Sequence, residues 1–141
     1  MNNKNYDERQ KFVNYRLSHH SLMIVFILLI VNALFKSTSG TTWAEPTAEM
    51  ILTITIPGIY YVSRSIFSDA YVGTRDSVRK NVVTFLFLAV LFFLASNLFY
   101  ADPIVEEGML TDTATPLIAG IFFVVISVLH GIKLIKDKSQ V

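Results

Sequence analysis

Apolar and polar residues alternate along this chain on the scale of a membrane crossing, not of a single helical turn. Four apolar stretches of about 20 residues each are separated by segments rich in charge. A helix of that length crosses the hydrocarbon core of a bilayer. We therefore predict an all-α, four-transmembrane-helix bundle with spans at about residues 17–36, 48–67, 81–100 and 115–134.

The basic residues give this arrangement a direction. Eleven of the twelve Lys and Arg residues lie before the first span, around the gap between spans two and three, or near the end of the chain; the exception is Lys36. Basic residues near short loops are retained in the cytoplasm. We therefore predict cytoplasmic N- and C-termini, with an amphipathic segment at 1–16, a loop at 68–80 and a tail at 135–141.

The net charge of +1 over 141 residues conceals a polarised molecule. The predicted outer side carries one Lys and six acidic residues, whereas the inner side carries eleven basic and five acidic residues. The inner basic belt should attract the anionic headgroups of the lipid bilayer. Nucleic acid is a poor partner for it, because the basic residues are spread over three short segments at a membrane surface.

The chain offers little for catalysis. It has no cysteine, which excludes disulfides and thiolate chemistry. Ser127 and His130 are neighbours on one predicted helix, but no third catalytic group is identifiable, and helix packing explains Ser127 more simply. We predict no enzyme, no catalytic residue, no cofactor and no metal site.

Three histidines, His19, His20 and His130, are predicted at one depth near the inner side. Neutral imidazole is a common ligand of haem and of metals, so a cofactor site is one interpretation. Each ring also lies near the end of a span, where it can meet water and headgroups. We favour this second interpretation.

Polar residues within the predicted spans suggest contacts between helices. Asn32 and Asn97 each lie about one turn from the outer end of a span, and a hydrogen bond between them, or to Thr53, would help fix the bundle. The alternative is that each amide is simply wetted at the membrane interface.

Small residues and proline indicate how two of the spans should be shaped. Pro57-Gly58 predicts a kink in the second span. Ser127 and Gly131, with Ala119 and Gly120, favour close helix contact on the fourth span, within one copy or between copies. Asp112 or Thr115 is expected to cap that span.

The first residues have the form of a helix start. Asn5 and Glu8 have the spacing of a capping box, so a helix should begin there. It can lie on the inner leaflet before turning into the first span, or it can be a solvated extension of that span.

Short motifs in the first half of the chain carry a resemblance to a known class. Tyr6-Asp7-Glu8-Arg9-Gln10, Trp43 and Ile66-Phe67-Ser68-Asp69-Ala70-Tyr71-Val72-Gly73 resemble small four-helix membrane proteins of Gram-positive bacteria classed as domains of unknown function. The resemblance implies a bacterial plasma membrane location and no particular chemistry. It also marks the first places to seek a partner-binding site: Asp7, Glu8, Arg9, Gln10, Asp69, Tyr71 and Gly73.

Two function classes follow. The first is a non-enzymatic interaction or regulatory protein whose cytoplasmic elements dock a partner protein or sense the bilayer. The second is a small transporter or channel subunit acting as a homo-oligomer. The chain resembles small multidrug transporters in size and span number, but it lacks the acidic residue that those proteins carry in their first span. We therefore favour the first class.

Overall fold

A computed structural model describes residues 8–68, 70, 75–99 and 102–139. The described part is all-helical apart from one short hairpin. In chain order its elements are α1 (Glu8–Ser39), α2 (Pro46–Phe67), α3 (Arg75–Phe99), β1 (Val105–Glu106), β2 (Met109–Leu110) and α4 (Ala114–Lys138).

All four helices are long and apolar enough to cross a membrane. The longest, α1, has 32 residues and at 1.5 Å per residue is about 48 Å long, which exceeds the roughly 30 Å hydrocarbon core. It runs without a break from the charged residues at its start into the apolar run. The first described residues therefore extend the first span, which is the second of the two expected arrangements; Asn5 lies outside the described residues.

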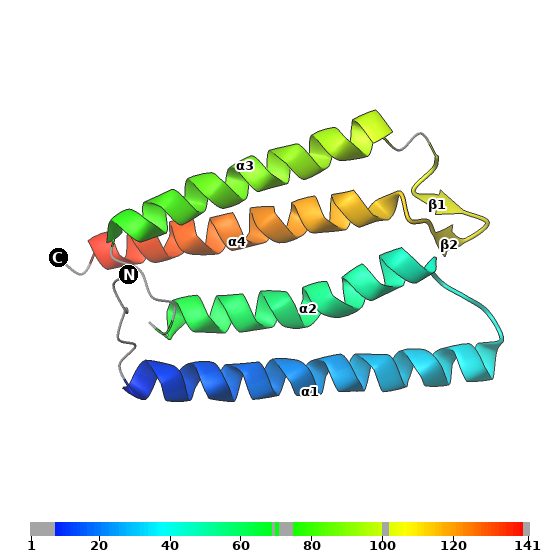
Figure 1. The fold of residues 1–141 in the computed structure, drawn as a ribbon, viewed down its shortest axis with the longest axis horizontal. Helices are drawn as coiled ribbons and strands as arrows, with labels where there is room; N and C mark the ends of the chain where they lie inside the picture. The colour runs from blue at the N-terminus through cyan, green and yellow to red at the C-terminus, as the bar shows by residue number, and fades with distance from the viewer. Residues whose placement is uncertain (1–7, 69, 71–74, 100–101, 140–141) are drawn as a thin grey trace, which may run out of the picture.

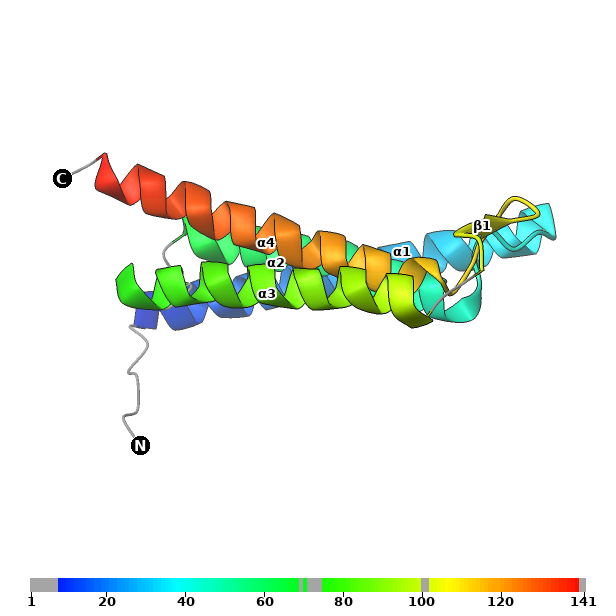
Figure 2. The ribbon, with the colours of Figure 1, turned by 90° about the horizontal axis from the view of Figure 1, so that it is seen from above.

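The helices form a single layer in the order α1, α2, α4, α3 (Figure 1). Figure 2 shows the same layer edge-on, and in this view the helices lie largely in front of one another. Within it α1 and α2 are antiparallel neighbours, as are α3 and α4, and α3 packs most extensively on α4. Because α4 lies between α2 and α3, the expected antiparallel packing of sequential helices holds for only the first and last pairs. The expected four-helix bundle is thus a flat one.

The layer has two distinct ends. The start of α1 and the end of α4 lie together at one of them, which we call the terminal end (Figure 1). The loop between α1 and α2 and the hairpin of β1 and β2 lie at the other, which we call the hairpin end. Side chains that meet across helices therefore come from neighbouring helices and from the same level along the layer.

Close packing of α3 on α4 depends on small residues and aromatic rings. A Cβ atom added to Gly120 would lie 2.9 Å from the ring of Phe93, so α3 approaches closely at this position. The Ser127 hydroxyl donates to the carbonyl oxygen of Val82 at 3.1 Å, as the packing interpretation of Ser127 requires. At Gly131 an added Cβ would meet nothing within 4 Å, so this glycine makes no close helix contact within one copy, the first of the two expected alternatives.

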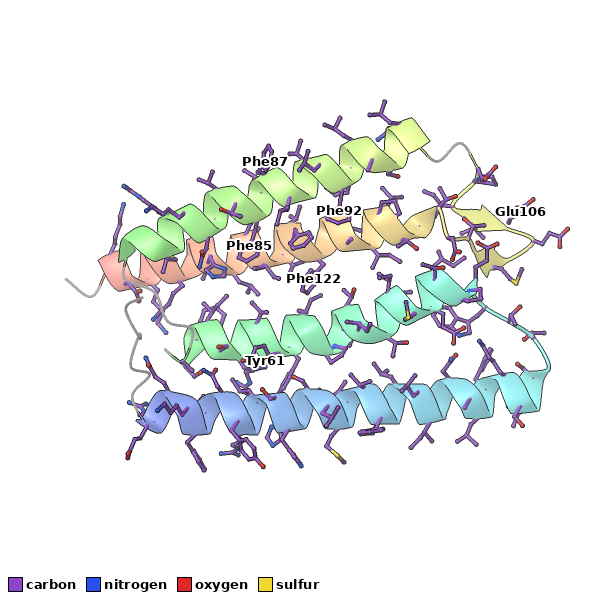
Figure 3. All side chains as sticks on the ribbon, in the orientation of Figure 1. Tyr61, Phe85, Phe87, Phe92, Glu106 and Phe122 are labelled. Carbon is purple, nitrogen blue, oxygen red and sulfur yellow. The ribbon has the colours of Figure 1, made fainter. Side chains whose placement is uncertain are left out.

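Aromatic side chains fill the space on either side of α4. Phe123 on α4 stacks on Phe85 and Phe92 of α3, with ring centroids 6.1 and 5.4 Å apart. Phe122 reaches α2, where its ring would lie 3.2 Å from a Cβ at Gly58. In Figure 3, Phe87 points away from the layer, in keeping with its 62% exposure. Such outward apolar side chains are expected where lipid, not water, surrounds a helix.

The second helix contains Pro57 and stays helical through it. Figure 1 shows α2 changing direction between its two halves, which agrees with the predicted kink. The carbonyl oxygen of Pro57 accepts a bond from the Ser21 hydroxyl at 3.4 Å, which ties α1 to α2 at mid-length.

At the hairpin end the two connecting segments bind each other. The amide of Leu110 donates to Trp43, and its carbonyl accepts from the amide of Glu45 at 2.8 Å. The Asp112 carboxylate accepts from the amide of Ala48 at 3.0 Å, while its own amide donates to the Glu45 carboxylate. Asp112 therefore caps α2, although it was expected to cap the fourth span. The residue at the N-cap of α4 is Thr113, without a side-chain cap bond.

The hairpin itself was not predicted, because its strands are only two residues long. Its turn contains Glu107 and Gly108, with φ of 48° and 82°. Two left-handed residues make the tight turn that suits the twist of paired strands. In Figure 3 the neighbouring Glu106 projects from the hairpin into the surroundings.

Candidate functional site

The described part of the first predicted partner segment lies at the terminal end (Figure 1). Glu8 and Arg9 are exposed in the first turn of α1, and Gln10 is half-buried beside them. The other residues that the resemblance marks, Asp7, Asp69, Tyr71 and Gly73, lie outside the described residues.

A short chain of hydrogen bonds joins the surroundings of these two segments. The Asn14 amide donates to the carbonyl oxygen of Ala70 at 3.2 Å and accepts from the Ser65 hydroxyl at 3.3 Å. Asn14 is one helical turn beyond Gln10, and Ala70 lies between the marked residues Asp69 and Tyr71. Ser65 and Ala70 are each only 1% exposed, so this is a buried connection. Segments that are about 56 positions apart in the sequence thus meet at one place.

Beside this connection α1 and α2 enclose a groove of about 340 Å³, which we call the arginine groove. Arg16 on α1 and Arg64 on α2 both line it. Its remaining described lining residues are aromatic, aliphatic or neutral polar: Phe12, Val13, Leu17, His20, Tyr60, Phe67 and Ser68.

The three histidines do not converge. The Nδ1 atom of His20 is 3.2 Å from the hydroxyl of Tyr60, in the wall of the arginine groove. His19 is exposed next to it, with a ring-centroid distance of 6.3 Å. His130 is buried between α3 and α4, where Nδ1 donates to the Ile126 carbonyl at 2.9 Å and the ring packs against Phe85. Within the described residues, no three His, Asp or Glu side chains are placed to hold a metal ion.

At the hairpin end a polar cluster joins α1 to α2. Asn32 and Lys36 lie four residues apart, hence on one face of α1, and each donates to a different carboxylate oxygen of Glu49. The indole Nε1 of Trp43 donates to Oδ1 of Asn32 at 2.7 Å. Glu49 is in the first turn of α2, where the helix dipole also favours a negative charge.

This cluster differs from the predicted polar contacts. Asn32 does bond to a neighbouring helix, but its partner is Glu49, not Asn97. Asn97 is exposed and donates to the Phe93 carbonyl of its own helix at 2.8 Å. Thr53 likewise donates within α2, to the Glu49 carbonyl at 2.8 Å. The predicted pairing of Asn32 with Asn97 is wrong because α1 and α3 form opposite edges of the layer (Figure 1).

The Lys36 and Glu49 pair was missed by sequence reasoning, although a signal for it exists. Lys36 is the only basic residue on the predicted outer side, and Glu49 lies just across the connecting loop at the same level. Beside the cluster, α1 and α2 enclose a second groove of about 390 Å³. Its lining is mainly apolar, and it includes Asn32 and Trp43 of the cluster.

Comparison with known proteins adds no family to these observations. The chain matches no protein-family model, no curated protein sequence and no solved structure. The function must therefore be argued from the chain itself.

Proposed function

We propose that this chain is a multi-pass protein of the bacterial plasma membrane that acts by interaction or regulation, not by catalysis. Support for insertion comes from four helices of membrane-spanning length and apolarity. In this proposal the terminal end, with its basic residues, faces the cytoplasm. The resemblance to small four-helix membrane proteins of Gram-positive bacteria supports the same location.

The observation that carries the interaction proposal is the buried link from Asn14 to Ala70. It joins Asn14, near the start of α1, to Ala70, which follows α2 in the sequence. Two short motifs that are separate in the sequence can therefore form one composite surface for a cytoplasmic protein partner. The exposed Glu8 and Arg9 supply charges of both signs to that surface.

The use of the polar side chains within the helices also supports interaction over catalysis. Ser127 donates to α3, Asn32 and Lys36 bind α2, and Ser21 reaches the bend of α2. Each bond ties one helix to another or to its own backbone. These groups are therefore accounted for by holding the layer together.

The test is crosslinked pull-down from native membranes, comparing wild type with the joint change of Asp7, Glu8, Arg9 and Gln10 to Ala. We expect this variant to lose the partner while its insertion is unchanged, because Glu8 and Arg9 are exposed in the first turn of α1, outside its apolar run. The matched control is Lys136→Ala with Lys138→Ala, two exposed residues at the same end on α4. Recovery of the same proteins from wild type and variant would contradict the proposal.

The orientation needs its own test, so that a lost partner is not confused with a misplaced terminus. Reporter fusions at both termini should report a cytoplasmic location, and fusions in the loop after α1 and in the hairpin should report an external one. A reporter at either terminus that scores as external would overturn the orientation.

The alternative is a small transporter or channel subunit that acts as an oligomer. The observation in its favour is the ion pair of Lys36 and Glu49 above an apolar groove, next to a helix bent at proline. Protein-dependent proton or drug flux in liposomes, abolished by Glu49→Gln, would favour this role over interaction.

A further inference from the structure

The arginine groove is lined by both positively charged and apolar side chains. Arg16 and Arg64 contribute two positive charges from two helices, and none of its described lining residues is acidic. Neither arginine has an ion-pair partner among the residues that the structure describes. Two guanidinium groups beside one cavity, with no ion-pair partner within the described part of the chain, favour an anionic ligand.

The remaining polar groups of the groove are already engaged with the protein. His20 and Tyr60 bond to each other, and the Ser68 hydroxyl donates to the Arg64 carbonyl at 2.6 Å. The arginines are therefore the groups left to recognise a charge. A guanidinium has a planar set of N–H donors that fits two oxygens of a phosphate at once.

The other walls of the groove are suited to a hydrocarbon chain. Phe12, Val13, Leu17 and Phe67 line it together with the arginines. A ligand that satisfies both kinds of wall has an anionic head and an apolar tail. The volume of about 340 Å³ can hold a headgroup and the beginning of a chain, since pockets for small ligands start at roughly 300 Å³.

The position of the groove on α1 points to the source of such a ligand. Arg16 is the last charged residue of α1 before its long apolar run, whose side chains from Leu22 to Phe35 are largely exposed. In a membrane this is the level at which apolar helix surface gives way to the headgroup layer. A phosphate reaches the groove at this level as part of a lipid more readily than as a free ion.

We propose that the arginine groove binds the phosphodiester headgroup of an anionic phospholipid. Arg16 and Arg64 donate to the phosphate oxygens, and Phe12, Leu17 and Phe67 contact the first carbons of an acyl chain. The inference rests on the proposed insertion and orientation, but it does not depend on a protein partner at Glu8 to Gln10.

The experiment uses the full chain in phosphatidylcholine nanodiscs with and without phosphatidylglycerol, followed by native mass spectrometry of the lipid that stays bound. Wild type should retain phosphatidylglycerol over phosphatidylcholine. Arg16→Gln with Arg64→Gln should weaken that retention by about tenfold or more, the effect of losing charge-assisted hydrogen bonds. Arg16→Lys with Arg64→Lys should lose part of it, because the charge stays and the planar donor set does not.

The matched control is Lys136→Gln with Lys138→Gln, which removes two exposed charges from the same end outside the groove. It should retain lipid as wild type does. An equal loss in this control would mean that the basic belt attracts lipid in general, and it would overturn the proposed site. Thermal unfolding of each variant must match wild type, and the Lys variant serves if the Gln variant is unstable.

Two further measurements are needed. One distinguishes a lipid from a free phosphate as the ligand, and the other distinguishes failure of the lipid site from failure of the proposed membrane insertion. If soluble glycerol phosphate displaces the lipid as effectively as short-chain phosphatidylglycerol does, the groove takes a free phosphate and the lipid proposal fails. Wild-type protein that alkaline washing removes from membranes would refute insertion itself, a result distinct from loss of lipid in the variants alone.

Discussion

The amide of Asn32 serves two partners at once, because its nitrogen donates to Glu49 while its oxygen accepts from Trp43. With Lys36 on the second carboxylate oxygen, two side chains of α1 bind one acid of α2, and Trp43 from the following loop holds one of them in place. An uncompensated acid near a membrane is costly. The cluster therefore both neutralises Glu49 and fixes how α1 lies on α2.

A double-mutant cycle measures this contact. We expect Asn32→Ala and Glu49→Ala to show a coupling energy of about 1 kcal/mol, in the range found for hydrogen bonds between membrane helices. Unfolding titrations of the four proteins in mixed micelles provide the free energies. The cycle of Asn32→Ala with Asn97→Ala is the control and should show no coupling, because the two residues share no partner. Equal coupling in both cycles would contradict the structure.

At the scale of elements, the packing of α3 on α4 depends on Gly120, a position of α4 without a side chain. Gly120 allows the Phe93 ring to lie against the backbone of α4, whereas the space around Gly131 is open. The two glycines belong to the same helix, so the same substitution at each provides a direct comparison.

We expect Gly120→Ala to be less stable than Gly131→Ala by about 1–3 kcal/mol, the usual cost of overpacking. Both variants gain the same helix propensity of about 1 kcal/mol, which cancels in the comparison. Thermal unfolding in detergent measures the difference. Adding Phe93→Leu should restore much of the loss at Gly120, and equal stability of the two alanine variants would argue against this close approach.

The sequence predicted the helices better than their ends. The four apolar runs were long enough to identify a helix each, but α3 begins at Arg75, where a loop was expected. Arg79 and Lys80 are good helix formers that stop a membrane span without stopping the helix. The apolar run therefore ends at these charges, whereas the helix continues past them.

The helix that a polar side chain contacts was harder to predict than the position of that side chain along its own helix. Asn32 was correctly singled out for an interhelical bond, yet nothing in the sequence states which helix lies next to α1. An amphipathic stripe normally gives this information, but α1 is apolar on all sides and buries only Leu17. The arginine groove was missed for the same reason, since it exists only once Arg16 and Arg64 are neighbours.

At the scale of the molecule, the order of helices in the layer is the feature to test. The chain has no cysteine, so introduced pairs report without background. We expect Gly58→Cys with Phe122→Cys to crosslink with a short bismaleimide, because a Cβ at position 58 lies 3.2 Å from the Phe122 ring. Asn32→Cys with Asn97→Cys should stay unlinked within one copy, since α2 and α4 lie between them. Gel mobility separates links within a copy from links between copies, and the opposite pattern would refute the layer.

The cap that Asp112 places on α2 bears on how the protein is made. Ala48 and Asp112 are 64 positions apart, so a nascent chain contains the first two helices well before it contains the carboxylate that caps the second. Until translation reaches the residues that follow the hairpin, the first turn of α2 has an open backbone amide at Ala48. The hairpin end is therefore completed late in synthesis, and a truncated product that stops before residue 112 lacks this cap on α2 although the bonds between α1 and α2 can already form.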